Sequence, residues 1–329
     1  MPPSQSLYFR IVTALASAAL ISAAYVGVNS FAPKDFIPGT IVHVEKSSSL
    51  GTTATILAKD HVIKSAFFFK VLATLRGARH GIAAGDYLFK TAPFSWTVAG
   101  RLVRGDQGLD PIKVTLPEGL TVHAMGDVLA KNIKGFDEKT FLSLAHLDRV
   151  ASSSEGYLFP DTYLFYPNVT AQKVFSTLRD TFNQKIKILD VPTRTIPKTH
   201  SVKDVVTLAS IVEKEASVMS DRRIVAGILW KRLAAGRALQ VDPPFAYILG
   251  KSSDELTLQD LQVDSPYNTY KNKGLPPTPI DNPGIEAMTA AISPTETAYW
   301  FYLSDKKGNM HYAVTYDGHL ANRAQYLGK

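Results

Sequence analysis

The most regular hydrophobic pattern in the chain runs from Lys203 to Val218. Apolar residues recur at positions 205, 206, 208, 209, 211, 212 and 216, and at about 100° per residue they gather on one broad face of a helix. The pattern predicts an amphipathic helix with Glu213 and Glu215 on the two flanks of its apolar face. Lys214 points nearly opposite to that face, so we expect it to be the solvated residue of the three.

A second pattern is the uncharged run of 22 residues from Ile11 to Ala32, which is rich in Ala, Ile, Leu and Val. A run of that length can cross a bilayer. We therefore expect a transmembrane anchor over residues 10–32, with the tail 1–9 in the cytoplasm and the rest of the chain outside. Small residues near positions 22–24 leave a cleaved signal peptide as the alternative.

The remainder of the chain mixes short strand-like and separate helix-like stretches, which predicts the α+β class. We expect a small subdomain over 33–110, with strands at 40–44 and 85–89 and helices between them. A larger α+β domain is expected over 111–329. Its core, 190–329, would begin with a linker that contains two prolines.

The two glutamates of the amphipathic helix differ in their surroundings. On the helical wheel Glu215 lies between Leu208 and Ile211, whereas the neighbours of Glu213 are smaller. Bulky apolar neighbours desolvate a carboxyl group and raise its pKa. An acid that is still protonated near neutral pH can break a glycosidic bond. Periodicity alone also permits a solvated face with Glu/Lys pairing.

Several short motifs accompany this helix along the chain. They are Glu155–Tyr163 (EGYLFPDTY), Leu239–Pro243 (LQVDP), Tyr267–Tyr270 (YNTY), Gly274–Pro277 (GLPP) and Asn282–Gly284 (NPG). With these motifs in this order, the chain from about residue 40 to its C-terminus resembles the YceG-like endolytic murein transglycosylases, membrane-anchored enzymes of the bacterial cell envelope.

The resemblance implies a lytic transglycosylase. Such an enzyme cleaves the β-1,4 bond between N-acetylmuramic acid and N-acetylglucosamine of nascent glycan without consuming water, leaves a 1,6-anhydromuramic end and so terminates elongation. One carboxyl group serves twice, first protonating the departing oxygen and then accepting the proton of the muramic 6-hydroxyl. The catalytic glutamate of the family corresponds to Glu215, and Glu213 remains the alternative.

The resemblance further implies a LysM-like character for residues 33–110. It implies a single-pass anchor in the inner (cytoplasmic) membrane, with the catalytic domain on the periplasmic or external side. Peptidoglycan strands would be the substrate, and peptidoglycan synthases at the membrane would be partners.

Polar residues of the downstream motifs are candidates for binding the sugar. They lie among turn-forming prolines and aromatic residues, where a groove offers hydrogen bonds and stacking faces. Their alternative role is to shape turns and core. The chain departs from the family pattern at Val241, Pro244 and Thr278, which affects the expected groove shape but not the acid. The candidates are Gln240, Asp242, Tyr267, Asn268 and Tyr270.

Four other titratable residues receive a structural interpretation. Glu155 and Asp161 flank an aromatic stretch, where a second acid is conceivable but a turn or capping role is favoured. His311 and His319 lie in the segment 309–322, whose alternating pattern resembles a strand. Either histidine could line a cleft, although a surface or packed position is favoured.

Other classes of chemistry find little support in the sequence. The 8 histidines are scattered and cysteine is absent, so no metal site is predicted. No phosphate-binding or dinucleotide motif is present, so no cofactor is predicted. The net charge of +7 suits work beside anionic lipid or acidic wall polymers. The Lys and Arg residues of the chain are dispersed, which argues against nucleic acid as a partner.

Two alternative functions remain. One is a non-catalytic peptidoglycan-binding or scaffold protein, although such a module would not need the Glu-Lys-Glu helix. The other is a hydrolytic muramidase, which usually needs a second carboxylate to activate water or to form a covalent intermediate. The sequence shows no clear second carboxylate at a matching site, with Glu155, Asp161 and Asp242 as the remaining candidates.

Overall fold

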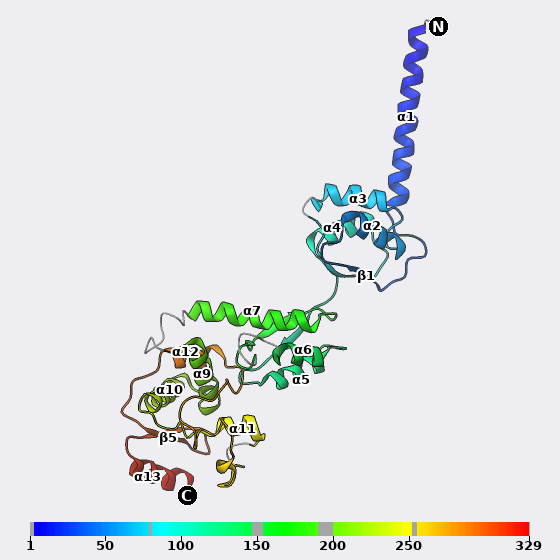
Figure 1. Ribbon diagram of the computed structural model, residues 1–329. Helices are drawn as coiled ribbons and strands as arrows, with labels where there is room; N and C mark the ends of the chain where they lie inside the picture. Colours follow the sequence, from blue (N-terminus) through cyan, green and yellow to red (C-terminus); the bar gives the residue numbers. More distant parts are fainter. Residues whose placement is uncertain (1–2, 79–80, 147–153, 190–199, 252–254, 329) are drawn as a thin grey trace. The chain divides into compact units, whose positions relative to one another are not determined.

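In the computed structural model, the residues described are 3–78, 81–146, 154–189, 200–251 and 255–328 (Figure 1). They form helices and short antiparallel pairs of strands, so the expected mixture of helix and strand is confirmed. The chain divides into two compact units, Met1–Asp110 and Pro111–Lys329. The linker expected at the start of the catalytic core lies, except for His200, outside the described residues.

The first unit begins with the long helix α1 (Pro3–Asn29), drawn in blue in Figure 1. Its Tyr8–Asn29 stretch has 22 residues with a mean hydropathy of 2.0, which is long and apolar enough to cross a membrane. The helix α1 is therefore a candidate membrane anchor, although a signal sequence has the same length and composition. The end of α1 is tied to the unit, because Ser95 donates its hydroxyl to Asn29 O at 2.6 Å.

The rest of this unit is a small layered fold. Strands β1 and β2 pair antiparallel, with Thr40 opposite Phe89, and two helices lie between them in sequence. Side chains of both strands and of the helices share one apolar core, which includes Val42, Phe69 and Tyr87. The elements are β1 (Thr40–Val44), α2 (Leu50–Lys59), α3 (Ala66–Leu75), β2 (Gly85–Phe89) and α4 (Ser95–Arg104).

The second unit opens with another antiparallel pair, in which Ile112 of β3 lies opposite Phe165 of β4. Three helices share an apolar core with these strands. The elements are β3 (Ile112–Thr115), α5 (Val122–Asn132), α6 (Glu138–His146), β4 (Thr162–Phe165) and α7 (Ala171–Leu189).

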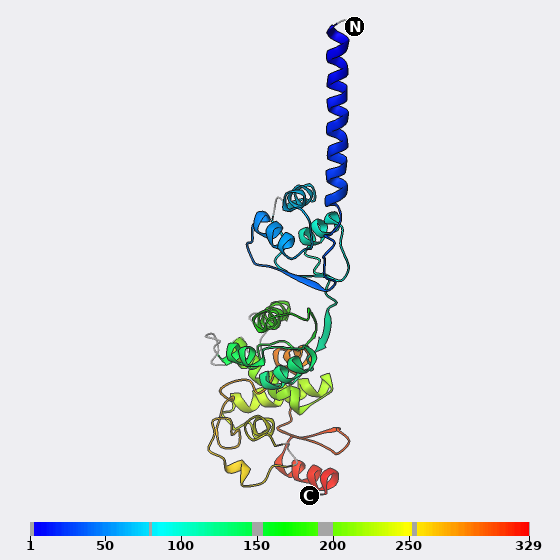
Figure 2. The ribbon, with the colours of Figure 1, turned by 90° about the vertical axis from the view of Figure 1, so that its right-hand side faces the viewer.

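A second core of this unit is built around α9, which is packed against α10 and α12. Near the C-terminus, the β5–β6 hairpin and α13 are in contact (Figure 2). The elements are α9 (Val202–Glu215), α10 (Met219–Ala234), α11 (Pro243–Leu249), η2 (Asp260–Gln262), α12 (Ile285–Ile292), β5 (Phe301–Ser304), β6 (Met310–Ala313) and α13 (Tyr316–Leu327).

Helix α9 is the amphipathic helix that the sequence predicts. Ser201 and Asp204 form a reciprocal capping box at its start. The helix ends at Glu215, three residues before the expected boundary at Val218, because Ala216 adopts an extended conformation with φ −145°. Glu215 is therefore the last residue of the helix, where the chain turns away from the core.

The C-terminal segment 309–322 differs from the expected strand. Only Met310–Ala313 is a strand, β6, and a helix follows from Tyr316 onward. Thr315 caps this helix by accepting a hydrogen bond from Gly318 N at 3.1 Å.

Candidate active site

A cavity of about 560 Å³ lies at the C-terminal end of α9. Segments far apart in sequence meet in its wall: the end of α9, the α10 residue Arg232, the loop before α11, the strand β5 and one side of α13. Its lining residues include Glu215, Arg232, Gln240, Asp242, Tyr270, Tyr302, Tyr316, His319 and Arg323.

Glu215 reaches this cavity with a partly exposed side chain. Burial raises the pKa of its carboxyl group to about 7, and the negative charge of Asp242 adds to the rise. The hydroxyl of Tyr302 and the positive charge of Arg232 act in the opposite direction. Near neutral pH the group is present in both protonation states, as a residue that donates and then accepts a proton requires.

Tyr302 and Arg232 frame this carboxyl group. The Tyr302 hydroxyl is buried, and within the described residues it makes no hydrogen bond of ordinary geometry. Burial and the neighbouring Glu215 raise the pKa of Tyr302 well above its usual value, so its hydroxyl remains a donor. Arg232 donates from Nε to Trp300 O at 3.1 Å and also to Leu239 O. The guanidinium thereby fixes two cavity segments while its charge acts on Glu215.

Asp242 is a second carboxylate in the same cavity. It precedes α11, whose first turn is fixed by Pro243 and Pro244. Tyr270 donates its hydroxyl to Asp242 Oδ1 at 2.6 Å, so the two candidates are joined. Of the three candidates for a second carboxylate that the sequence leaves, Asp242 is the one that lines the same cavity as Glu215.

Gln240 also lines the cavity, and its side chain is exposed. Its φ of 51° places a residue other than glycine in the left-handed region. That conformation is uncommon, and strained positions of this kind concentrate at functional sites. The Gln240 N–H donates to Thr269 O at 3.0 Å, which holds the backbone in this conformation.

Asn268, a candidate for binding the sugar, lies outside the cavity lining. It is completely buried, and its side-chain amide donates to Leu261 O at 3.0 Å and Val263 O at 2.8 Å. Its side-chain oxygen accepts from the N–H groups of Tyr270 and Lys271. The amide is thus fully used within its own loop, and it positions Tyr270 instead of lining the cavity.

Tyr267 lies outside the cavity lining as well. Its hydroxyl shares a hydrogen bond of 2.7 Å with Thr278, and its ring packs against Tyr247. Thr278 is one of the positions where the chain departs from the family pattern, and this bond ties it to the YNTY loop.

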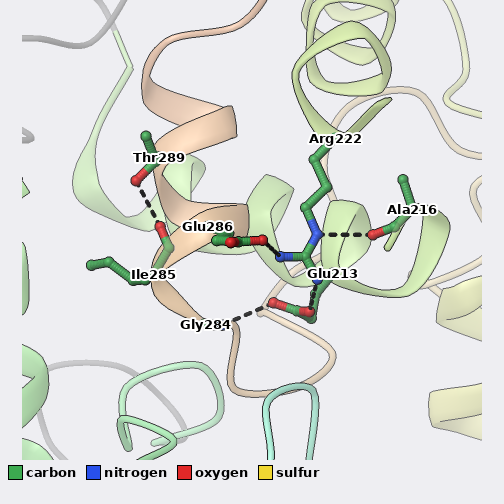
Figure 3. A network of polar contacts seen from close by, with 7 residues as sticks. All are labelled: Glu213, Ala216, Arg222, Gly284, Ile285, Glu286 and Thr289. Atoms are coloured by element: carbon green, nitrogen blue, oxygen red, sulfur yellow. Dashed lines mark hydrogen bonds and ion pairs between the residues drawn. The ribbon is translucent and has the colours of Figure 1, made fainter. Parts of the chain in front are cut away.

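Glu213 is locked into a network of polar contacts, shown in Figure 3. Its Oε1 pairs with Arg222 Nη2 at 2.6 Å, and its Oε2 accepts from Gly284 N at 2.9 Å. Arg222 also donates to Ala216 O at 2.9 Å and to Glu286 at 2.9 Å. The network fastens the last turn of α9 to α10 and to the start of α12. Both oxygens of Glu213 are engaged in this network and the residue lies outside the cavity lining, whereas Glu215 lines the cavity.

The remaining titratable candidates lie apart from the cavity, with one exception. Burial raises the pKa of Glu155 to about 7, but its carboxylate accepts from Val122 N and Asn282 Nδ2 inside the fold. Asp161 accepts from Thr162 N at 2.7 Å in a turn. His311 pairs with Asp305 at 3.1 Å. The exception is His319, which lines the cavity and stacks on Phe301.

Across the part of the chain that the structure describes, no group of three or more His, Asp or Glu side chains is arranged to hold a metal ion. Lys214 is exposed, as the helical pattern predicts. The pattern missed Arg232, Tyr302 and the α13 residues of the cavity, whose positions are set by contacts distant in sequence.

Known proteins provide close comparisons. The endolytic murein transglycosylase of Bacillus subtilis strain 168 is 29% identical over 307 residues, covering 87% of this chain and 84% of that protein. The protein of the same name from Streptococcus pneumoniae R6 is 25% identical over 323 residues, covering 87% of this chain and 58% of its own length.

A crystal structure of a putative yceG-like protein from Listeria monocytogenes superposes with a TM-score of 0.58 at 29% identity. The match covers 86% of this chain and 98% of the Listeria chain. The sequence profile of the YceG-like family matches residues 42–325, most of the chain. This protein therefore belongs to the YceG-like family.

Proposed function

We propose that this protein is an endolytic murein transglycosylase of the lytic type, in which Glu215 acts as both acid and base. The observation that supports this most directly is the carboxyl group of Glu215, which has a pKa of about 7 and lines a cavity large enough to hold sugar rings. The names of the Bacillus and Streptococcus relatives support the same activity.

The reaction needs two proton transfers at one carboxyl group. Protonated Glu215 donates to the glycosidic oxygen as the bond from the muramic anomeric carbon to that oxygen breaks. The resulting carboxylate then accepts the proton of the muramic 6-hydroxyl, whose oxygen forms the new bond to the anomeric carbon. The product is a 1,6-anhydromuramic end, no water is consumed, and Glu215 returns to its protonated state.

Neighbouring groups would assist each stage. The Tyr302 hydroxyl lowers the pKa of Glu215, and it would donate to the Glu215 carboxylate between the two transfers and so stabilise it. The Asp242 carboxylate favours positive charge, which develops at the anomeric carbon as the bond breaks. Gln240, Asp242 and Tyr270 line the cavity and form the proposed sugar-binding set, with Asn268 and Tyr267 in support of their loop.

We further propose that α1 anchors the protein as a single span in the cell membrane, with residues 33–329 on the periplasmic or external side. The 22-residue apolar stretch supports the span. Residues 33–110 would form a LysM-like subdomain that holds a glycan strand, in support of which two antiparallel strands enclose two helices in sequence. The catalytic domain would span 111–329, and peptidoglycan synthases at the membrane would be the partners.

A hydrolytic muramidase is the second candidate, and Asp242 is the observation that favours it. Two carboxylates in one cavity permit one to protonate the leaving oxygen while the other activates water or attacks the sugar. The two functions differ in product, since a hydrolase leaves a reducing muramic end that is heavier by one water molecule.

The test is cleavage of isolated glycan strands, followed by mass spectrometry of the new ends. We expect 1,6-anhydromuramic ends from the native protein. Glu215→Gln keeps the shape but cannot deliver a proton, so its rate should fall by a factor on the order of 10² or more. Folded Glu215→Gln protein that cleaves at the native rate would overturn the assignment. Native protein that binds strands without cleaving them would instead indicate a scaffold.

A further inference from the structure

One side of α13 forms a wall of the cavity that contains Glu215. The α13 residues that line it are Tyr316, His319, Arg323 and Leu327. Their spacing of three or four residues places them on one side of the helix. Helix α13 is held in place by its contacts with β5 and β6 and by the Asn322 side chain, which donates to Tyr312 O at 3.3 Å. The cavity therefore has a wall, packed against the β5–β6 hairpin, that carries the positive charge of Arg323.

Arg323 differs from the other arginine of the cavity. Arg232 is buried and donates to the carbonyls of Leu239 and Trp300. Arg323 is partly exposed, and within the described residues it has no ion pair or hydrogen bond. Its guanidinium, with five N–H donors in a planar fork, is available to a ligand in the cavity.

The charge of Arg323 is separate from the chemistry of the acid. The groups that set the pKa of Glu215 are Asp242, Tyr302 and Arg232, together with burial, and Arg323 is not among them. Arg323 does act on its helix neighbour His319, whose pKa is lowered by burial and by the positive charges of Arg323 and Arg232. His319 is therefore neutral near pH 7, and Arg323 is the charged group of this wall.

The proposed substrate offers one kind of complementary group. The sugar rings of murein carry no charge, whereas the muramic side group carries carboxylates, either on its lactyl ether or on an attached stem peptide. A guanidinium pairs with a carboxylate through two parallel hydrogen bonds, which gives directional selectivity as well as affinity. The Asp242 carboxylate repels such a group, and Arg232 already donates to the carbonyls of Leu239 and Trp300, so the α13 wall is the part of the cavity that accepts it.

We infer that Arg323 binds a carboxylate of the muramic side group and makes the cavity selective for muramic-containing glycan over neutral N-acetylglucosamine polymers. The inference rests on the proposed function and assigns the substrate feature that this cavity recognises. Arg323 is a binding residue that contributes to specificity and takes no part in proton transfer.

Binding measurements by calorimetry, in a Glu215→Gln background that does not cleave, test the inference. Four probes of equal sugar length are compared: glycan with stem peptides, glycan without peptides and with free lactyl carboxylates, the same glycan with those carboxylates amidated, and a neutral chito-oligosaccharide. We expect a carboxylate-bearing probe to bind more tightly than the last two. If the first probe binds more tightly than the second, the carboxylate recognised belongs to the stem peptide. If the second binds more tightly, it is the lactyl carboxylate.

Adding Arg323→Gln should weaken binding of the carboxylate-bearing probe roughly tenfold or more and leave the neutral probes unchanged. Arg323→Lys should retain part of the selectivity, since it keeps the charge but loses the fork. Lys306→Gln is the matched control, because Lys306 is an exposed cation outside the cavity lining. Equal binding of all four probes by the Glu215→Gln protein would overturn the inference without any Arg323 variant.

Kinetics provide a second measurement. In the protein that retains Glu215, Arg323→Gln should raise KM for muramic-containing strands, with kcat and the pH profile unchanged. A lower kcat with unchanged KM would also overturn the inference. If the native protein cleaves no strands at all, the proposed function fails, whereas the binding comparison still decides on the carboxylate.

Discussion

Opposing neighbours set the pKa of Glu215. Burial and the Asp242 charge favour the protonated acid, while Tyr302 and Arg232 favour the carboxylate, and the balance lies at about 7. A catalyst that both donates and accepts a proton works best with a pKa near the ambient pH. A shifted pKa does not by itself identify the catalyst. Burial raises the pKa of Glu155 to a similar value, and Glu155 does not line the cavity.

The first residue-scale prediction concerns pH. The proposed mechanism requires protonated Glu215, so kcat/KM should fall as the pH rises through about 7. Tyr302→Phe removes a group that lowers this pKa, so the falling limb of the pH profile of kcat/KM should move to higher pH. Asp242→Asn removes a charge that raises it, so the limb should move to lower pH. Rates measured from pH 5 to 9 give the position of the limb, whatever each variant does to the maximum rate.

Matched behaviour of the two variants would count against this account. If Tyr302→Phe and Asp242→Asn shifted the limb in the same direction, or left it where it is, another group would be the titrating acid. Thr115→Ala is a suitable control, since its hydroxyl bonds to Thr162 in the β3–β4 pair and should leave the limb unchanged.

At this scale the sequence identified candidate residues but not all of their roles. The helical pattern favours Glu215 over Glu213 from the size of their neighbours, and Glu215 is the one of the two that lines the cavity. From the sequence, Asn268 is a candidate for binding the sugar. An asparagine that binds a sugar and one that is buried and holds its own loop occur in the same kind of turn, so the motif does not distinguish them. Arg232 could not be found, since a basic residue in the last turn of a helix usually lies in solvent.

At the scale of elements, the end of α9 is fixed by Arg222. Its guanidinium binds the terminal carbonyl of Ala216, the carboxylate of Glu213 and the carboxylate of Glu286, which joins three helices (Figure 3). The side chains of Arg222 and Glu213 are only 7% and 6% exposed. The network therefore determines the direction in which Glu215, the last helical residue, leaves the core.

Arg222→Ala should lower the free energy of unfolding by about 3 kcal/mol, because it leaves the buried Glu213 carboxylate without its partner. Glu286→Gln is the matched control: its side chain is 54% exposed, so its loss should cost less than about 1 kcal/mol. Urea unfolding followed by circular dichroism measures both. Equal costs for the two variants would show that the buried pair does not hold the helix end.

Elements were predicted best where the hydrophobic period is regular. The start of α9 was clear from its apolar face, but its end was placed too late because the Arg222 network has no local signal. Helix α13 was missed for a related reason. Tyr312, Val314 and Tyr316 alternate as in a strand, and the α13 residues of the cavity side are largely polar, which leaves no apolar helical stripe to recognise.

At the scale of the whole molecule, the N-terminal helix is a candidate membrane anchor. A protein that begins at Phe36 should be soluble and should cleave isolated peptidoglycan. The full-length protein should stay in the membrane fraction after a high-salt wash, because its apolar stretch is held by burial and not by surface charge. If the full-length gene product is instead released by the salt wash and its N-terminus lies near Ala24, the segment is a signal peptide that has been removed.

The ordered motifs indicated the family, but the cavity could not be derived from them. Its wall takes residues from position 215 to position 327, brought together by the packing of α9, α10, the β5–β6 hairpin and α13. The mixed fold and the apolar N-terminal helix follow from local patterns. Asp242 and Glu215 come together only through tertiary contacts. Because two carboxylates in one cavity also suit a hydrolase, the central question is whether water or the muramic 6-hydroxyl attacks the sugar.

Cleavage in water labelled with heavy oxygen answers that question most directly. If Glu215 acts alone and the muramic 6-hydroxyl is the nucleophile, the new muramic ends should carry no label in either the native protein or Asp242→Asn. Label at the muramic ends of the native product, lost in Asp242→Asn, would show that Asp242 activates water. That result would contradict the transglycosylase mechanism and establish a muramidase.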